Sequence, residues 1–117
     1  MERQRVFVTR RVPHEAIDLL WADLDVEVWP GEEAPPHNLL VQRAGECVAF
    51  LTTVDDQIGE TVLAAGRGSL KVVANCAVGF DNFDVETATR LGVAMCNTPD
   101  VLTKTTADLT FALILAT

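Results

Sequence analysis

The fold is decided by the stretch KVVANCAVGFDNFD, residues 71–84, in which an apolar run leads directly into a polar segment. Residues 71–77 are rich in the β-branched and small side chains typical of a buried strand. Gly79, Asp81 and Asn82 follow at once, and residues of these types favour turns. The stretch therefore predicts a central strand that ends in an exposed loop.

The same change from strand to helix pattern occurs five times along the chain. Short apolar strands are predicted at residues 6–8, 26–29, 47–51, 71–77 and 93–96. Helical spacing of apolar residues follows Pro13, with weaker signals over residues 39–45. Such alternation within one domain predicts an α/β fold with a five-stranded parallel sheet and helices on both faces.

Two of the helices carry clear end signals. Asp55 is expected to cap a helix with Ile58, Val62 and Ala65 on one face, which Gly66 ends. In the same way, Asp84 is expected to cap a helix that ends at Gly92.

The last predicted helix has a different character. Thr103 can cap it, and residues 111–116 are apolar on all sides, so this helix should have packing partners all round. The pattern stops at Thr117 without a glycine cap or a basic last turn. We therefore expect a truncated sequence, and self-association or poor solubility caused by this helix.

Composition limits the partners. With 9 basic and 17 acidic residues, the net charge of -8 argues against nucleic acid and anionic membrane surfaces. The longest apolar run, residues 111–116, is far shorter than the ~20 residues of a membrane span. Cys47, Cys76 and Cys96 are widely spaced and odd in number, so we expect reduced, buried cysteines and a cytoplasmic protein.

Several common motifs are absent from the sequence. Gly66 and Gly68 precede a predicted strand, whereas a dinucleotide-binding glycine motif follows one, so they are interpreted as a helix-to-strand turn. His14 and His37 have no Cys/His cluster beside them, so no metal site is predicted. The acidic residues of a phosphate-accepting receiver domain are also missing after the first and third strands.

Two hypotheses remain for the loop after residue 77. Loops at the carboxyl ends of parallel strands often bind ligands, and Gly79 would let the N–H groups of Val78 and Gly79 approach a carboxylate. Alternatively, Gly79 supplies unusual backbone angles for a plain turn, with Asp81 and Asn82 bonding the backbone. The residue pattern alone leaves both hypotheses open.

A family resemblance bears on this choice. The stretch KVVANCAVGFDNFDVETATRLGVAMCNTPDVLTKTTADLTFALILA, residues 71–116, resembles the D-isomer-specific 2-hydroxyacid dehydrogenases. Their pattern here is A-V-G-x-D-N/H-x-D, followed by N-T-P-x-x-L-T-x-x-T-A-D/E-L. VFVTRRVP, residues 6–13, and the strand ending in Leu51 and Thr52 resemble the glyoxylate and hydroxypyruvate reductase branch.

The resemblance implies a domain division and a set of site residues. Residues 1–101 would form a flavodoxin-like, three-layer substrate-binding domain, and residues 102–117 an interdomain helix at the start of a missing Rossmann NAD(P)-binding domain. Asp108 matches a position that is usually acidic in the family. The residues implied in binding are, for the substrate, Leu51, Thr52, Val78 and Gly79, and, for the cofactor, Thr106.

By the same resemblance, the chain would be the substrate-binding part of an oxidoreductase. The complete enzyme would be a homodimer that reduces glyoxylate or hydroxypyruvate to a D-2-hydroxyacid with NADH or NADPH. The family's catalytic Arg, His and Glu and its G-x-G-x-x-G loop have no counterpart in the 117 residues. We therefore expect no catalytic residue, no activity and no tight NAD(P) binding in this chain alone. The alternative is a non-catalytic interaction module left by truncation.

Overall fold

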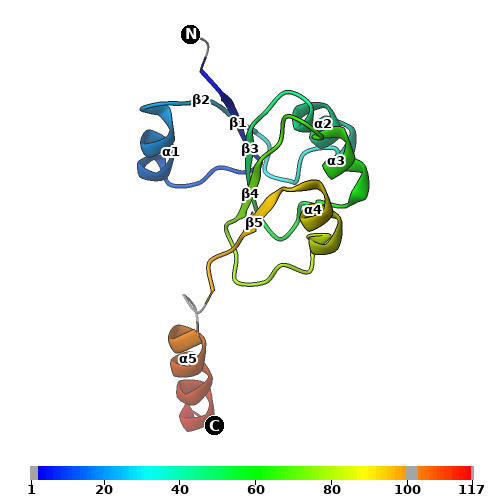
Figure 1. Cartoon of the computed structure of the whole chain (residues 1–117). Coiled ribbons are helices and arrows are strands. Elements are labelled where there is room, and N and C mark those ends of the chain that lie inside the picture. The colour runs from blue at the N-terminus through cyan, green and yellow to red at the C-terminus, as the bar shows by residue number, and fades with distance from the viewer. Residues whose placement is uncertain (1–2, 100–102, 117) are drawn as a thin grey trace.

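The structure, a computed structural model, describes residues 3–99 and 103–116. Strands and helices alternate through these residues, as predicted (Figure 1). In chain order the elements are β1 (Arg5–Val8), α1 (His14–Trp21), β2 (Asp25–Val28), α2 (His37–Ala44), β3 (Ala49–Thr52), α3 (Glu60–Ala65), β4 (Val72–Asn75), α4 (Val85–Leu91), β5 (Ala94–Cys96) and α5 (Thr103–Ala116). All strand pairs are parallel, in the order β2-β1-β3-β4-β5. The predicted α/β fold is confirmed.

Helices lie on both faces of the sheet, but unequally. Figure 1 shows α2, α3 and α4 together on one side and α1 alone on the other. Under the three helices, Phe7, Phe50 and Val73 from neighbouring strands are fully buried, and the two rings meet edge to face with centroids 5.8 Å apart. On the α1 side, Val6 and Val8 pack against Ile17. Each face of the sheet thus has its own apolar core.

The predicted Asp55 cap is wrong, because the third helix begins later. α3 starts at Glu60, after Gly59, and residues 53–58 form a loop. Ile58 in this loop pairs with Phe83 in an isolated parallel bridge. Asp55 instead accepts a bond from Arg10 at 3.0 Å. A tertiary contact between two loops therefore replaces the first turn that the sequence predicted.

The cysteines are only partly as expected. Cys47 is buried in the core below α2 and α3, whereas Cys76 and Cys96 are exposed. Cys96 lies on the edge strand β5, and Cys76 follows the last residue of β4. The expectation of three buried cysteines is therefore wrong for two of them.

Helix α5 stands apart from the sheet (Figure 1). The side chains of residues 104–116 are all exposed, including Phe111 and Leu113 at 62% and 60%. The proposed boundary between residues 101 and 102 and the expected capping side chain of Thr103 lie outside the described part of the structure. No helix within residues 3–99 and 103–116 is long and apolar enough to span a membrane.

Candidate functional site

The candidate site lies where neighbouring parallel strands end. β1, β3 and β4 are adjacent in the sheet, so the loops that leave their carboxyl ends meet at one edge. These loops include residues 53–59 and residues 76–83, which the Ile58 and Phe83 bridge joins. In open α/β sheets this edge is where ligands bind.

The loop after β4 turns its carbonyl oxygens toward the protein. The Ala77 oxygen accepts from the Thr98 N–H at 2.9 Å, and the Val78 oxygen accepts from Asn97 Nδ2 at 2.8 Å. No peptide bond described is cis, and in a planar trans peptide the N–H points opposite to the C=O. The N–H groups of Val78 and Gly79 therefore point away from residues 97 and 98.

These two N–H groups are open to a ligand. Among the described residues, neither N–H donates a hydrogen bond, and both Val78 and Gly79 are exposed. The Gly79 carbonyl is also held, because it accepts from Asn75 Nδ2 at 3.0 Å. Two adjacent exposed donors with anchored carbonyls are suited to an anion such as a carboxylate.

Gly79 is not required by the backbone of this chain. Its φ is not positive, and a Cβ built there would meet nothing within 4 Å. The turn hypothesis, in which Gly79 supplies unusual backbone angles, is therefore wrong for φ. A glycine that neither φ nor neighbouring atoms demand is consistent with close approach of a ligand.

Asn82 holds the loop in place. It is buried, and its Nδ2 donates to the carbonyl of Asp56 at 2.8 Å and to that of Thr53 at 3.1 Å. Its Oδ1 accepts from Asn75 Nδ2 at 3.2 Å. Asp81 is exposed and makes no hydrogen bond among the described residues, so the anchoring role expected of both residues belongs to Asn82.

Leu51 and Thr52 are the last two residues of β3, at the end of the strand where the sequence placed them. Thr52 is buried, and its hydroxyl donates to Asn75 Oδ1 at 3.0 Å. Leu51 is half-buried and packs on the α1 side of the sheet with Val8. Thr52 therefore bonds to Asn75, and Asn75 in turn donates to the Gly79 carbonyl in the loop after β4.

A second group of polar residues ties neighbouring loops together. Buried Asp56 accepts hydrogen bonds from the hydroxyl of Thr9 and, at 2.9 Å, from the N–H of Thr53. Beside it, Arg10 donates to Asp55 at 3.0 Å and to the carbonyl of Glu32 at 2.8 Å. The loops after β1, β2 and β3 are therefore linked. Sequence reasoning missed this group, because Thr9 and Arg10 are over 20 residues away from the partners that they bind.

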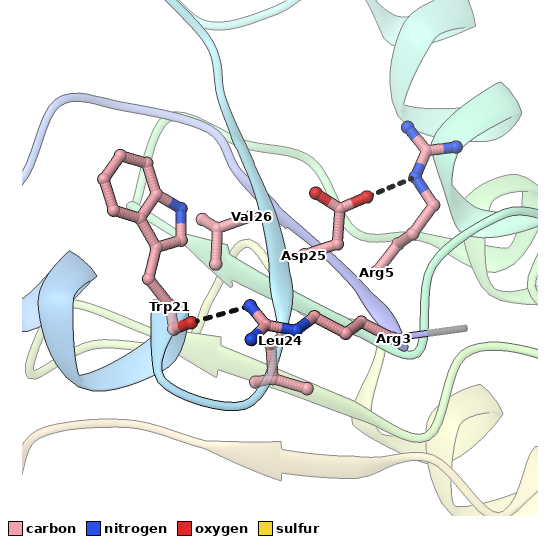
Figure 2. Close-up of a pocket in the computed structure, with 6 residues that line it drawn as sticks. All are labelled: Arg3, Arg5, Trp21, Leu24, Asp25 and Val26. Carbon is pink, nitrogen blue, oxygen red and sulfur yellow. Dashed lines mark hydrogen bonds and ion pairs between the residues drawn. The ribbon is translucent and has the colours of Figure 1, made fainter. Parts of the chain in front are cut away.

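Two hollows differ in their relation to this site. One of about 210 Å³ borders it and is lined by Phe80, Phe83, Val85, Met95, Cys96 and Asn97. A wider one of about 840 Å³ lies at the amino ends of β1 and β2, the opposite edge of the sheet. There Arg3 donates to the carbonyl of Trp21, and Arg5 faces Asp25 at 3.9 Å (Figure 2). Since its charges are already paired, the wider hollow is the weaker candidate.

The predicted cofactor residue, Thr106, is not joined to these residues. It is exposed on α5, where its carbonyl accepts from the Thr110 hydroxyl at 2.8 Å. Among the described residues, no hydrogen bond connects it with Val78, Gly79 or Thr52.

Comparison with known proteins places the sequence of this chain in a family. The model of the D-isomer specific 2-hydroxyacid dehydrogenase catalytic domain matches residues 6–113. A glyoxylate reductase of Aeropyrum pernix is 51% identical over 116 residues, covering 99% of this chain and 34% of that protein. A glyoxylate reductase of Thermococcus kodakarensis is 44% identical, with 98% and 34% covered.

Solved structures share the fold. The TT0316 protein of Thermus thermophilus has a TM-score of 0.84 and 43% identity, over 96% of this chain and 36% of that one. An NADPH-dependent glyoxylate/hydroxypyruvate reductase of Sinorhizobium meliloti, in complex with NADP and malonate, has a TM-score of 0.74 and 26% identity over 97% and 34%. The chain thus spans about a third of the length of these relatives. With residues 6–113 matched, it belongs to the D-isomer specific 2-hydroxyacid dehydrogenase family, within the catalytic domain.

Proposed function

We propose that this chain is the substrate-binding part of an oxidoreductase that reduces small 2-oxoacids, glyoxylate or hydroxypyruvate, to D-2-hydroxyacids. Relatives at 51% and 44% identity are named glyoxylate reductases, and the S. meliloti relative is named for both substrates. These names support the substrate class for the chain.

A single observation carries the proposal: the exposed N–H groups of Val78 and Gly79, with their carbonyls anchored behind them. A 2-oxoacid carboxylate placed here would accept two charge-assisted hydrogen bonds, each worth about 1.5–3 kcal/mol. Thr52 would act from below, by holding Asn75 and through it Gly79. Leu51 would support the same strand from the other face.

The proposed division of labour follows the family pattern. Residues 1–101 would be the substrate-binding body, and residues 102–117 would belong to an interdomain helix on which Thr106 would approach the nicotinamide of NAD or NADP. When bound, the nicotinamide cofactor supplies a hydride. The 117 residues contain no G-x-G-x-x-G loop to hold its pyrophosphate, so the residues present do not fit that part of the cofactor. The chain itself binds and orients the oxoacid.

Calorimetric titration with oxamate, an unreactive amide analogue of a 2-oxoacid, tests the proposal. We expect weak binding, with a Kd of about 1–10 mM, because only part of the site is present. Acetamide, which lacks the carboxylate, should not bind. Equal binding of both compounds, or of neither, would contradict the proposal.

An activity assay completes this test. Purified chain mixed with NADPH and glyoxylate should leave the absorbance of NADPH unchanged, because the 117 residues contain no counterpart of the family's proton-donating His and no glycine-rich loop for the cofactor. If NADPH oxidation persists after the chain has been purified again, the chain catalyses the reaction, and the proposal that it only binds the substrate is wrong.

A further inference from the structure

A buried carboxylate close to the candidate site has no part in the proposed binding of the substrate. Asp56 is 1% exposed and lies in the loop that follows β3. A charged group is costly to bury unless hydrogen bonds stabilise it. Its Oδ2 accepts from the hydroxyl of Thr9 and, at 2.9 Å, from the N–H of Thr53. Its Oδ1 is buried without a hydrogen-bond partner among the described residues, so a single oxygen holds both donors.

These bonds close a tight turn, residues 53–56, which we call the β3 turn. The N–H of Asp56 donates to the carbonyl of Thr53 at 3.1 Å, while the N–H of Thr53 donates to the Asp56 side chain. The turn is therefore held from both ends. Thr9 ties it to the sheet, because the N–H of Thr9 donates to the Leu51 carbonyl at 3.0 Å.

The β3 turn sets the direction in which the Asn82 side chain faces. Asn82 Nδ2 makes its two shortest bonds with the carbonyls of Asp56 and Thr53, at 2.8 and 3.1 Å. A side-chain amide has two N–H donors on one side and an acceptor oxygen on the other. Asn82 Oδ1 consequently faces Asn75, and it accepts from Asn75 Nδ2 at 3.2 Å.

Asn75 extends this chain of bonds to the loop after β4. Its Nδ2 donates to the carbonyl of Gly79 at 3.0 Å as well as to Asn82. The side chains in the chain are all buried, with Asp56, Asn82 and Asn75 at 1%, 7% and 2% exposed. Water therefore has little access to replace a bond that is lost.

We propose that Asp56 is a positioning residue of the anion site. Through the β3 turn and the two asparagines, its carboxylate holds the backbone of Gly79 in the conformation that presents the N–H groups of Val78 and Gly79. In this role Asp56 acts through other residues and does not contact the ligand. The role rests on the proposed function, since it concerns the same site.

Titration of three ¹⁵N-labelled variants with oxamate, followed by NMR, tests this role. Asp56→Ala should weaken the Kd for oxamate by about tenfold, because the β3 turn loses the acceptor that closes it. Asp56→Asn should bind within about threefold of wild type, because one amide oxygen can accept both bonds that Oδ2 accepts. Thr9→Val removes only a hydroxyl, should also weaken binding, and replaces Asp56→Ala in the test if that variant does not fold.

Asp84→Ala is the matched control. The carboxylate of Asp84 accepts the same two kinds of bond, from the hydroxyl and the N–H of Thr87, but it bonds to neither Asn82 nor Asn75 among the described residues. This variant should lose stability and keep the oxamate affinity of wild type. The side-chain amide signals of Asn75 and Asn82 should shift in Asp56→Ala and stay in place in Asp84→Ala.

Each other outcome overturns the proposal. Equal losses of affinity in Asp56→Ala and Asp84→Ala would mean that lower stability alone weakens binding. Equally weak binding by Asp56→Asn and Asp56→Ala would mean that the negative charge matters and the hydrogen bonds do not. A wild type that does not bind oxamate would overturn the proposed function and this role with it. Wild-type binding that neither Asp56→Ala nor Thr9→Val weakens would overturn the role of Asp56 alone.

Discussion

At the candidate anion site, Gly79 stands where neither its φ nor neighbouring atoms require a glycine. Gly79→Val should therefore leave the fold intact but crowd an anion that approaches the Val78 and Gly79 N–H groups. Loss of one charge-assisted hydrogen bond, about 1.5–3 kcal/mol, corresponds to roughly a ten- to hundredfold weaker Kd for oxamate. Calorimetry measures the affinity, and thermal unfolding measures the stability.

Gly59 provides a matched control for that substitution. A Cβ there would also meet nothing within 4 Å, and its φ of -99° suits any residue. Gly59→Val should keep the oxamate affinity of wild type. If Gly79→Val binds oxamate as well as Gly59→Val does, the carboxylate does not lie at Gly79.

Asn82 should matter more to stability than its exposed neighbour Asp81. Asn82→Ala removes the donor shared by the Asp56 and Thr53 carbonyls and the acceptor for Asn75. Leaving these buried groups unpaired should lower the free energy of unfolding by about 1–3 kcal/mol. Urea titration measures the loss, and Asp81→Ala should remain close to wild type. Equal stability of the two variants would contradict the anchoring role of Asn82.

The sequence predicted the position of the exposed loop after β4 better than the hydrogen bonds of the buried residues beneath it. Val78 and Gly79 could be located, because a loop at the carboxyl end of a parallel strand has a known place in an α/β fold. Thr52 was predicted as a substrate contact, yet its hydroxyl is used internally by Asn75. The bonds of Asn82 to residues 53 and 56 join distant segments, and no local pattern reveals them.

Among the helices, α4 shows how a cap links stability to pH. The carboxylate of Asp84 accepts from the hydroxyl and the N–H of Thr87, which lowers the pKa of Asp84 below its ordinary value. Because the pKa of Asp84 in the folded protein lies below the ordinary value of 3.8, the cap stabilises the fold at pH values above 3.8. This stability is lost as the pH falls through the folded-state pKa.

Asp84→Ala should therefore lower Tm near neutral pH and have progressively less effect below pH about 4. Thermal unfolding across the acid range measures the difference between the two proteins. A difference in Tm that stays constant down to strongly acidic pH would show that the charge of Asp84 contributes nothing to the cap.

Gly92, unlike Gly79, is required by the backbone. It ends α4 with a φ of 74°, in the left-handed region that side chains with a Cβ disfavour. Gly92→Ala should lower the free energy of unfolding by about 1 kcal/mol, measured by urea titration. Since a Cβ there would meet nothing within 4 Å, a stability equal to wild type would mean that the φ value carries no strain.

The two capping predictions had different outcomes because of tertiary contacts. Asp84 and Asp55 both precede an apolar helical pattern, and Asp84 caps α4 as predicted. Asp55 is drawn to Arg10, and Ile58 pairs with Phe83, so the backbone before α3 is held in a loop. Local spacing predicted the existence of each helix, whereas contacts between loops decided where α3 begins.

In the molecule as a whole, the parallel sheet supports the loops at the carboxyl ends of its strands, where the candidate site lies. Burial under α2, α3 and α4 fixes the strands, and the buried asparagines fix the loop that carries Val78 and Gly79. The five-strand alternation was predictable from apolar runs. The uneven cover of the two faces was not, because it depends on where α1 and α5 lie in space.

In the proposed function, the N–H groups of Val78 and Gly79 bind the carboxylate of a 2-oxoacid. Amide-resolved NMR of ¹⁵N-labelled chain titrated with oxamate tests it most directly. The Val78 and Gly79 resonances should shift furthest and saturate together, while amides around the hollow at Arg3 and Trp21 should stay unchanged. Shifts centred on that hollow, or no shift at Val78 and Gly79 at saturating oxamate, would contradict it.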